Sequence, residues 1–414
     1  MTPTEVLLAF AFYYPVVMSF FWMTGGIYYY VRRERRARPR HQPPPMDTYP
    51  FASILVPCHN ESDNVDETIE ALLQQQYPDF EIIAINDGST DATGAHLDAL
   101  AAVHERLRVI HLDHNVGKAN AMRMGALAAR SEYLVCIDGD ALLDEYATHW
   151  MVWHLCSGPR VGAVTGNPRI RNRSTLLGKL QVGEFSSIIG MIKRAQRVYG
   201  RLFTVSGVIS AFRKTALHQV GYWSNDIVTE DIDISWRLQI DRWDIRYEPN
   251  ALCFILMPET LRGLWRQRLR WAQGGLEVLL RHGSRLFEWR RRRMWIVVAE
   301  YLLSVGWGVA MLSLIVLWAL SQFLPLPAEL HVGGLVPRWH GVVLAMVCLL
   351  QFAISLWIDR RYEPTTGRTY YWMIWYPAVY WLLSLTTTLA AIPKTFLRRR
   401  GQLAVWISPD RGYR

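Results

Sequence analysis

Two acidic side chains stand one residue apart in the stretch 133–143, which reads YLVCIDGDALL. The five largely apolar residues before Asp138 are typical of a strand that is buried on both faces of a sheet. Asp138 and Asp140 would then point to the same side, about 7 Å apart, and Gly139 between them would let a ligand approach the backbone. Because two such carboxylates repel each other unless a divalent cation lies beside them, the stretch predicts a metal site. The alternative is a solvated loop after a strand.

Two earlier predicted strands also end in polar residues. The first ends at Pro57 and is followed by Asn60 and Glu61, and the second ends beside Asp87. Strands and helices alternate along this part of the chain, over the residues 51–57 (strand), 64–75 (helix), 80–85 (strand), 107–112 (strand), 118–129 (helix) and 133–137 (strand). The alternation predicts an α/β domain whose mostly parallel sheet is covered by helices on both faces. Since ligands bind at the carboxyl ends of the strands in such sheets, we expect these side chains to gather at one edge.

Two further clusters lie nearer the carboxyl end. Thr229, Glu230 and Asp231 precede a short predicted helix at 233–238. The amphipathic stretch 261–280 is basic and aromatic, which favours a position at a membrane surface; it carries Gln267, Arg268, Arg270 and Trp271. An earlier amphipathic stretch, 174–198, is expected either to pack on the domain or to lie along the membrane.

The composition indicates a membrane protein. Apolar residues make up 51% of the 414 residues, there are 18 Trp, and the net charge is +9. Four uncharged runs are long enough to cross a bilayer, namely 6–31, 301–328, 341–358 and 370–393. Arginine blocks beside such runs are typical of the cytoplasmic side of a membrane, and this placement disfavours nucleic acid as a partner. The five cysteines form no Cys-x-x-Cys pair and are expected to be reduced.

The chain is expected to have six parts, which are a transmembrane helix (1–31), a basic, proline-rich linker (32–50), the α/β domain (51–255), interfacial helices (256–294), three transmembrane helices (295–393) and a tail (394–414). Three spans after a cytosolic domain would put the carboxyl end outside, yet Lys394 and the arginines at 398–400 favour the inside. Either one span is re-entrant or the basic tail is tolerated outside.

In their order and separations, the clusters resemble the signature of the processive, membrane-bound family-2 glycosyltransferases, which include synthases of cellulose, chitin and hyaluronan. The matching residues are Asp87, Asp138/Asp140, Thr229-Glu230-Asp231 and Gln267/Arg270/Trp271. Within that family, bacterial poly-β-1,6-N-acetyl-D-glucosamine synthases are similar over 161–171, 203–209, 229–236 and 267–275. One departure is at the amino end, where some relatives carry two apolar segments and this chain has one. The resemblance implies a glycosyltransferase-A-like cytosolic domain with a helical transmembrane bundle in the bacterial inner membrane.

The resemblance also implies how a UDP-sugar donor would be held. Asp138 and Asp140 would hold Mg²⁺ or Mn²⁺ on the diphosphate, and one of them could contact the sugar or the ribose instead. Lys118 could touch a phosphate, although its surroundings lack the P-loop spacing; the alternative is a solvated lysine at a helix start. The nucleotide would be bound by the residues that end the first two strands: Pro57, Asn60, Glu61 and Asp87.

Asp231 is the candidate general base, with Glu230 as the alternative. The interpretation without a catalytic role is that Asp231 only caps the helix. The base would take the proton of the attacking sugar hydroxyl. One base without a covalent nucleophile implies single displacement with inversion, so that an α-linked donor gives a β-linked product. Among Gln267, Arg268, Arg270 and Trp271, the arginines would counter the diphosphate and the tryptophan would stack on the acceptor sugar. Alternatively, this stretch is an interfacial helix without substrate contact.

The predicted activity is processive polymerisation of N-acetylglucosamine from UDP-N-acetylglucosamine into poly-β-1,6-N-acetyl-D-glucosamine, a biofilm exopolysaccharide exported through the membrane. The sugar and the linkage come from the resemblance alone. The alternatives are chitin-, hyaluronan- or cellulose-type synthesis, or a catalytically inactive membrane scaffold that responds to cyclic di-GMP. The implied partners are the donor, the growing glycan, membrane lipid and a small two-helix membrane subunit regulated by cyclic di-GMP, with no nucleic acid.

Overall fold

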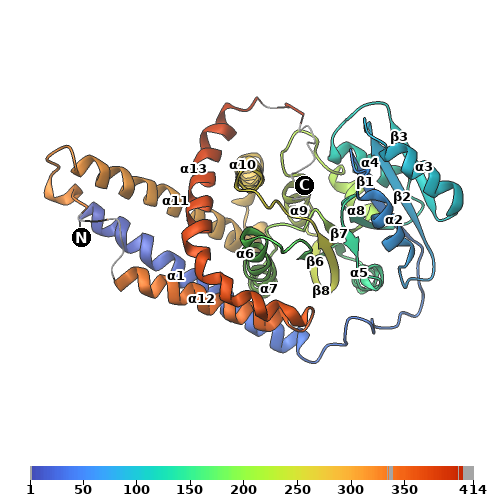
Figure 1. Cartoon of the computed structure of the whole chain (residues 1–414), viewed down its shortest axis with the longest axis horizontal. Helices are drawn as coiled ribbons and strands as arrows, with labels where there is room; N and C mark the ends of the chain where they lie inside the picture. The colour runs from blue at the N-terminus through green and yellow to red at the C-terminus, as the bar shows by residue number, and fades with distance from the viewer. Residues whose placement is uncertain (1, 333, 335–338, 400, 404–414) are drawn as a thin grey trace.

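Eight strands form one sheet in the order β3-β2-β1-β4-β7-β6-β8-β5 in the computed structural model, which describes residues 2–332, 334, 339–399 and 401–403 (Figure 1). The strands are β1 (Ala52–Cys58), β2 (Phe80–Asp87), β3 (Leu107–Leu112), β4 (Tyr133–Ile137), β5 (Leu142–Leu143), β6 (Val161–Ile170), β7 (Ile209–Arg213) and β8 (Asp244–Ile255). The four predicted strands are β1 to β4, and they pair in parallel. Every residue of β1 and β2 is buried, which explains their unbroken apolar character.

The other half of the sheet is mixed. β7 runs antiparallel to both β4 and β6, β6 is parallel to β8, and β5 pairs antiparallel with β8. The expected parallel arrangement therefore describes the amino-terminal half. The reversal at β7 matters for the site, because it brings the residues before β7 next to those after β4.

Helices cover both faces of the sheet, as expected. Alternate strand residues enter two separate cores, with Ile54 and Ile82 in one and Leu55 and Ile83 in the other. The covering helices are α2 (Val65–Leu73), α3 (Thr93–Val103), α4 (Lys118–Ala128), α5 (Ala147–Cys156), α8 (Lys214–Val220) and α9 (Glu230–Ile240). All five cysteines lie among the described residues, and none of them forms a disulfide bond there.

A continuous but irregular helix lies between the sheet and the long helices. It consists of α6 (Leu176–Glu184), a π-helical segment (Phe185–Met191) and α7 (Ile192–Tyr199). α7 packs against α1 (Pro3–Tyr29), where the rings of Phe21 and Tyr199 stack with their centroids 4.0 Å apart. The amphipathic stretch 174–198 thus packs on the domain with one side and on a long apolar helix with the other.

Buried charges fix the ends of two long helices to this irregular helix. Arg194 of α7 donates to Glu34 at 2.6 Å and lies 3.1 Å from Asp359, the last residue of α12 (Trp339–Asp359). Arg169 of β6 binds the same Asp359 at 2.6 Å. All four side chains are buried. Since a buried charge without its partner costs several kcal/mol, roughly 3–5 when one partner is removed, these pairs fix how α1 and α12 meet the domain.

Within the described residues, three helices are long and apolar enough to cross a membrane, namely Pro3–Glu34, Trp289–Ser321 and His340–Asp359. They contain α1, α11 (Trp295–Ser321) and α12, which lie side by side and project away from the sheet (Figure 1).

Two of these three helices lie after residue 294, where three spans are expected from the sequence, and the third span stays a prediction. The apolar run 370–393 is divided among a 3₁₀ segment (Pro364–Trp375), a π-helical segment (Pro377–Trp381) and α13 (Leu382–Leu397). Pro377 has no N–H to donate, which interrupts the helical hydrogen-bond ladder at this point. α13 runs across the direction of the three long helices (Figure 1) and packs along α10 (Leu261–Leu286).

Candidate active site

Three strand ends and one strand start meet at one edge of the sheet. β1 and β2 end in register, with Cys58 opposite Asn86, and β4 ends beside β1. Because β7 is antiparallel to β4, with Ile209 opposite Ile137, the segment before β7 lies beside the segment after β4. The topology therefore gathers the predicted acidic residues at one edge, where ligands of such sheets bind.

Lys118 links two of the predicted acidic clusters. Its Nζ lies 2.5 Å from Oδ1 of Asp138 and 3.5 Å from Oε1 of Glu230, and it donates to the carbonyl of Gly207 at 3.3 Å. Burial alone would lower the pKa of Lys118, but the carboxylates of Asp138 and Glu230 reverse this and hold the pKa above its usual value. The side chain is 18% exposed, so the interpretation as a solvated lysine does not fit.

Asp87 organises the loop that leads to Lys118. Its carboxylate accepts the backbone N–H of Val116 at 2.8 Å and that of Gly117 at 3.0 Å, and its side chain is fully buried. Gly117 has φ +88°, a conformation that favours glycine. Burial raises the pKa of Asp87, and the two N–H groups oppose this rise. The structure thus gives Asp87 a positioning contact that the sequence did not indicate, while its contact with a nucleotide stays a prediction.

The residues after β1 hold the neighbouring loop in place. Asn60, at φ +56°, accepts the N–H of Thr90 at 2.9 Å and donates its own N–H to Ser89 at 3.0 Å. Glu61 is buried, and its N–H donates to Thr93 at 2.7 Å. Both residues therefore lie at the expected edge, and their role toward a donor stays a prediction.

The glycine between the two aspartates sits against the end of β1. A Cβ at Gly139 would lie 3.0 Å from the carbonyl oxygen of Pro57 and 3.1 Å from the sulfur of Cys58. A side chain here would push Asp138 and Asp140 away from β1. Close packing thus favours glycine here, which adds a second reason to the one expected from ligand approach.

Helix α9 points its amino end at this edge and carries Asp231 in its first turn. Oδ2 of Asp231 faces Gly207, where a Cβ would lie 3.3 Å away. Burial and then the charge of Glu230 raise the pKa of Asp231 to about 6, while Lys118 and Arg270 act in the opposite direction. A carboxylate with a pKa this near neutrality is suited to accept a proton from a substrate.

Lys193 of α7 binds Ser206, the residue next to Gly207, and was not predicted as a site residue. Its ammonium nitrogen donates to Ser206 at 2.5 Å and to Thr165 at 3.1 Å, and the residue is 5% exposed. Within the described residues it forms no ion pair. Burial lowers the pKa of Lys193 to about 7, and the charge of Asp231 partly offsets this. The 206–207 segment therefore binds two lysines, Lys118 through the carbonyl of Gly207 and Lys193 through the hydroxyl of Ser206.

The two arginines of the motif on α10 are placed differently. Arg268 is buried, donates to Glu184 of α6 at 2.6 Å and lies with its guanidinium 4.2 Å from the ring centre of Trp271. Arg270 is exposed, forms no ion pair in the described part of the chain, and its charge acts on Asp231. The expected contact with a diphosphate suits Arg270, whereas Arg268 joins α10 to α6.

The remaining motif residues lie where α10 meets the site. Oε1 of Gln267 is buried and has no hydrogen-bond partner within the described residues. Trp271 packs partly buried against the main core. One turn further on, Gly274 lies so close to Thr229 that no Cβ would fit between them. The amino end of α9 is therefore held directly against α10.

Known proteins resemble this chain over nearly its whole length. The family model described as Glycosyl transferase family 2 matches residues 53–221. A poly-beta-1,6-N-acetyl-D-glucosamine synthase of Staphylococcus epidermidis is 38% identical over 409 residues, which cover 97% of this chain and 98% of the relative. The chain belongs to glycosyltransferase family 2. Another such synthase, from Staphylococcus aureus, is 40% identical over 404 residues, with 97% and 98% covered.

A solved structure supports the same fold for this family-2 glycosyltransferase. It is a mannosyltransferase from Pyrobaculum calidifontis in complex with GDP-Man and Mn²⁺, with a TM-score of 0.61 and 21% sequence identity, covering 94% of this chain and 99% of that one. At this identity the likeness concerns the fold, which is a glycosyltransferase-A-like α/β domain with helices beyond it.

The donor set at the sheet edge of this glycosyltransferase is small. Asp138 and Asp140 supply hard carboxylate oxygens, and in the part of the chain that the structure describes no third histidine, cysteine or acidic residue completes a metal-binding group with them. Mg²⁺ and Mn²⁺ in phosphoryl-binding sites take one or two carboxylates and complete their octahedral shell with phosphate and water. The pair therefore fits a cation that arrives with a diphosphate.

Proposed function

We propose that this protein polymerises N-acetylglucosamine from UDP-N-acetylglucosamine into poly-β-1,6-N-acetyl-D-glucosamine by an inverting, processive reaction. The observation that carries this proposal is that Asp231, Lys118 and Asp138 lie together at one edge of the sheet. The charge of Arg270 also acts on Asp231. A base, an ammonium group and a carboxylate for a cation are what glycosyl transfer from a nucleotide diphosphate requires.

Asp231 acts as the general base of the proposed reaction. The acceptor hydroxyl loses its proton to Asp231 as its oxygen forms a bond to the anomeric carbon of the donor. The bond from that carbon to the phosphate oxygen breaks on the opposite face, and the electron pair leaves with the nucleoside diphosphate. One displacement inverts the anomeric configuration, so the α-linked donor gives a β-linked product.

The leaving group is received by positive charge. Lys118 lies beside Asp138, and the charge of Arg270 acts on Asp231. We assign both side chains to bind the diphosphate oxygens as their charge grows. Mg²⁺ or Mn²⁺ held by Asp138 and Asp140 would supply further neutralisation of the same charge. Residues Asn60, Glu61 and Asp87 hold the nucleotide end at the tips of β1 and β2, as the motif resemblance implies.

The choice of sugar and linkage rests on the relatives. Two proteins that are 38% and 40% identical to this chain over 97% of its length are named as poly-beta-1,6-N-acetyl-D-glucosamine synthases. Gln267, with an unpaired buried oxygen, and Trp271 are the residues of α10 that we assign to the acceptor sugar.

We place the catalytic domain in the cytosol at the bacterial inner membrane, with the amino terminus outside. Three spans (α1, α11 and α12) then return the chain to the inside, and α13 stays there against α10. The basic side chains around Arg398, which binds Glu277 of α10 at 2.7 Å, are then cytosolic, in agreement with the positive-inside rule. This arrangement corresponds to the re-entrant alternative of the topology predicted from the sequence.

The two-helix membrane partner and the control by cyclic di-GMP stay predictions from the family resemblance. Titration of cyclic di-GMP into membranes, with and without such a subunit, measures whether the rate of polymer synthesis responds.

The experiment that tests the function uses membranes that contain the full chain and labelled UDP-N-acetylglucosamine. We expect a long insoluble product that a hexosaminidase specific for β-1,6 linkages degrades. Degradation by chitinase, hyaluronidase or cellulase instead would replace the proposed product by the corresponding glycan, and release of monosaccharide alone would contradict polymerisation.

A further inference from the structure

A polar pocket lies where the catalytic domain meets the start of α11, away from the candidate active site. It has a volume of about 300 Å³ and is lined by Ile240, Asp241, Arg242, Glu288, Arg290 and Arg291. One wall is the turn that ends α9, and the other is the 3₁₀ segment Trp289–Met294 that leads into α11. Any ligand here would touch the catalytic domain and the membrane anchor together.

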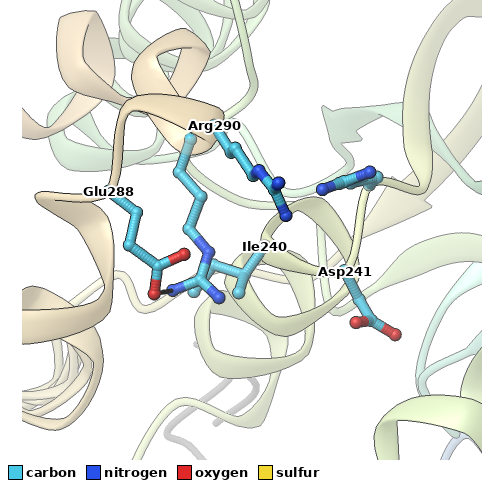
Figure 2. Close-up of a pocket in the computed structure, with 6 residues that line it drawn as sticks. Ile240, Asp241, Glu288 and Arg290 are labelled. Carbon is cyan, nitrogen blue, oxygen red and sulfur yellow. Dashed lines mark ion pairs between the residues drawn. The ribbon is translucent and has the colours of Figure 1, made fainter.

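The pocket contains more positive than negative charge. Glu288 binds Arg291 at 3.1 Å. The carboxylate of Asp241 accepts from Gln219 at 2.6 Å, and Figure 2 shows it pointing away from Arg290. Among the described residues, no ion pair involves Arg242 or Arg290. Two guanidinium groups that repel each other thus line one cavity, and an anion between them would remove the repulsion.

The backbone at Arg242 gives a second reason to assign a role to its side chain. Arg242 follows the last turn of α9 with φ +68°, and Trp243 donates its N–H to Leu238 at 2.9 Å, as in helix ends that normally use glycine. The same chain ends α8 with Gly221 at φ +82°. An L side chain in this conformation is strained relative to glycine, so Arg242 occupies a position that backbone geometry alone would give to glycine.

The pocket lies at the start of a helix that is long and apolar enough to cross a membrane. The apolar helix Trp289–Ser321 begins at this point. Phe287 and Trp289 are 87% and 68% exposed, and Trp295 is 40% exposed. Exposed aromatic rings at the end of a membrane helix are typical of the interface between headgroups and acyl chains.

We propose that Arg242 and Arg290 bind the phosphate of an anionic phospholipid, which thereby connects the catalytic domain to α11. The phosphate group is the chemistry that the pocket recognises, and an inorganic phosphate ion is its other source. Arginine suits this ligand because its planar fork donates two parallel hydrogen bonds to phosphate oxygens.

The competing explanation is that the arginines at 290–293 only orient the membrane helix. Positive charge suffices for that purpose, so lysine would serve equally well. Binding of a phosphate by a fork is lost in lysine. Charge-conserving variants therefore separate the two explanations.

The test uses the full chain in nanodiscs of phosphatidylethanolamine, phosphatidylcholine and phosphatidylglycerol, followed by native mass spectrometry of the lipids that remain bound. Wild type should retain phosphatidylglycerol in preference. The double variant Arg242→Lys/Arg290→Lys should retain about tenfold less. The variant Arg242→Gly, which relieves the backbone conformation and should fold at least as well as wild type, should also lose the lipid.

Arg292→Lys is the matched control, because Arg292 lies over the ring of Trp289 at 5.2 Å and does not line the pocket. This variant should retain the lipid. A second arm adds inorganic phosphate to the delipidated protein. Thermal stabilisation by phosphate in wild type but not in Arg242→Gly, without preferential retention of phosphatidylglycerol, would assign the pocket to the free ion and overturn the lipid. Equal lipid retention and equal response to phosphate in wild type and all variants would overturn the site.

Discussion

Arg268 donates to the carboxylate of Glu184 at 2.6 Å, and both side chains are only 8% exposed. Two residues further along the same helix, Arg270 is exposed and its charge acts on Asp231. One short motif thus contains an arginine that joins two helices and an arginine whose charge acts on the proposed catalytic base.

Substitution of the two arginines should separate stability from activity. Arg268→Ala should destabilise the protein by about 3–5 kcal/mol, because Glu184 is left as a buried carboxylate without its partner. Burial already raises the pKa of Glu184, and loss of Arg268 would raise it further. Arg270→Ala should leave the unfolding temperature unchanged and lower the rate of polymer synthesis about 100-fold, the effect of losing one group that stabilises developing charge. Thermal unfolding in nanodiscs and a radiolabelled polymer assay measure the two effects.

Glu184→Gln/Arg268→Met is the control for the buried pair, since neither residue is then charged. It should recover most of the stability that Arg268→Ala loses. If Arg270→Ala unfolds at a lower temperature and Arg268→Ala does not, the assignment of the two arginines is reversed.

Asp231→Asn should inactivate the enzyme and stabilise it. As the proposed base, its loss should lower the rate about 100- to 10,000-fold. Burial holds the pKa of Asp231 at about 6, above the ordinary 3.8, so the folded protein binds this proton more tightly than the unfolded chain does. The ionised form therefore destabilises the folded state above pH 6, and the neutral amide should recover roughly 1–2 kcal/mol after allowance for solvent screening.

The same polymer assay and thermal unfolding at neutral pH check this prediction. Asp226→Asn is a suitable control, because Asp226 pairs with Arg281 at the surface, and its loss should leave the rate near that of wild type. Retained synthesis in Asp231→Asn would exclude Asp231 as the base.

The rate should fall on the acid side with a midpoint near the pKa of Asp231, about 6, because only the ionised carboxylate accepts a proton. Lys193→Met removes a positive charge that favours this ionised form. The acid limb should therefore move to higher pH by about 0.5–1 unit. Lys193→Arg keeps the charge and should leave the limb in place. A uniform loss of rate in Lys193→Met, with an unmoved pH profile, would mean that Lys193 acts only through the hydroxyls of Ser206 and Thr165.

Removal of Lys118 should strengthen metal binding while it weakens catalysis. Its ammonium group lies 2.5 Å from Asp138 and repels a cation at the same carboxylate. In Lys118→Met, the affinity for Mn²⁺ should rise about tenfold, as expected when a positive charge beside the cation is removed near the protein surface. Polymer synthesis at saturating Mn²⁺ should fall, because the diphosphate loses a donor.

Titration of Mn²⁺ followed by electron paramagnetic resonance gives the affinity independently of the rate. Lys179→Met is the matched control, since Lys179 lies over the ring of Trp372 at 4.4 Å and should affect neither quantity. An unchanged affinity in Lys118→Met would place the cation away from Asp138.

The amino-terminal half of the site could be predicted from the sequence because it is built from local patterns. Uninterrupted apolar runs predicted β1, β2 and β4, and the polar residues that follow them lie at one edge as a consequence of parallel pairing. Asp138 could be named in advance for the same reason, and Lys118 from its place at the start of the predicted helix 118–129. Their contact with each other could not, because it depends on a loop whose backbone N–H groups bind Asp87.

Lys193 could not be found from helical periodicity. The π-helical segment Phe185–Met191 precedes it and adds a residue to the turn, which rotates every later side chain relative to a regular helix. The apolar run 370–393 gives the reverse case, since its hydropathy suits a span while Pro377 and the packing of α13 on α10 divide it. In both places, tertiary contacts decide what composition and periodicity leave open.

Lys193 and Arg194 are neighbours on α7, yet one binds the segment beneath the proposed base and the other binds Glu34 and Asp359, where two membrane helices end. Adjacent residues of α7 thus contact the proposed catalytic centre and the ends of α1 and α12. A mismatch between bilayer thickness and helix length is one cause of helix tilting, so we expect a change in acyl-chain length to act on α7 and, through it, on the segment that contains Ser206. For this enzyme, we therefore expect the reaction rate to depend on the acyl-chain length of the lipid in which it is measured.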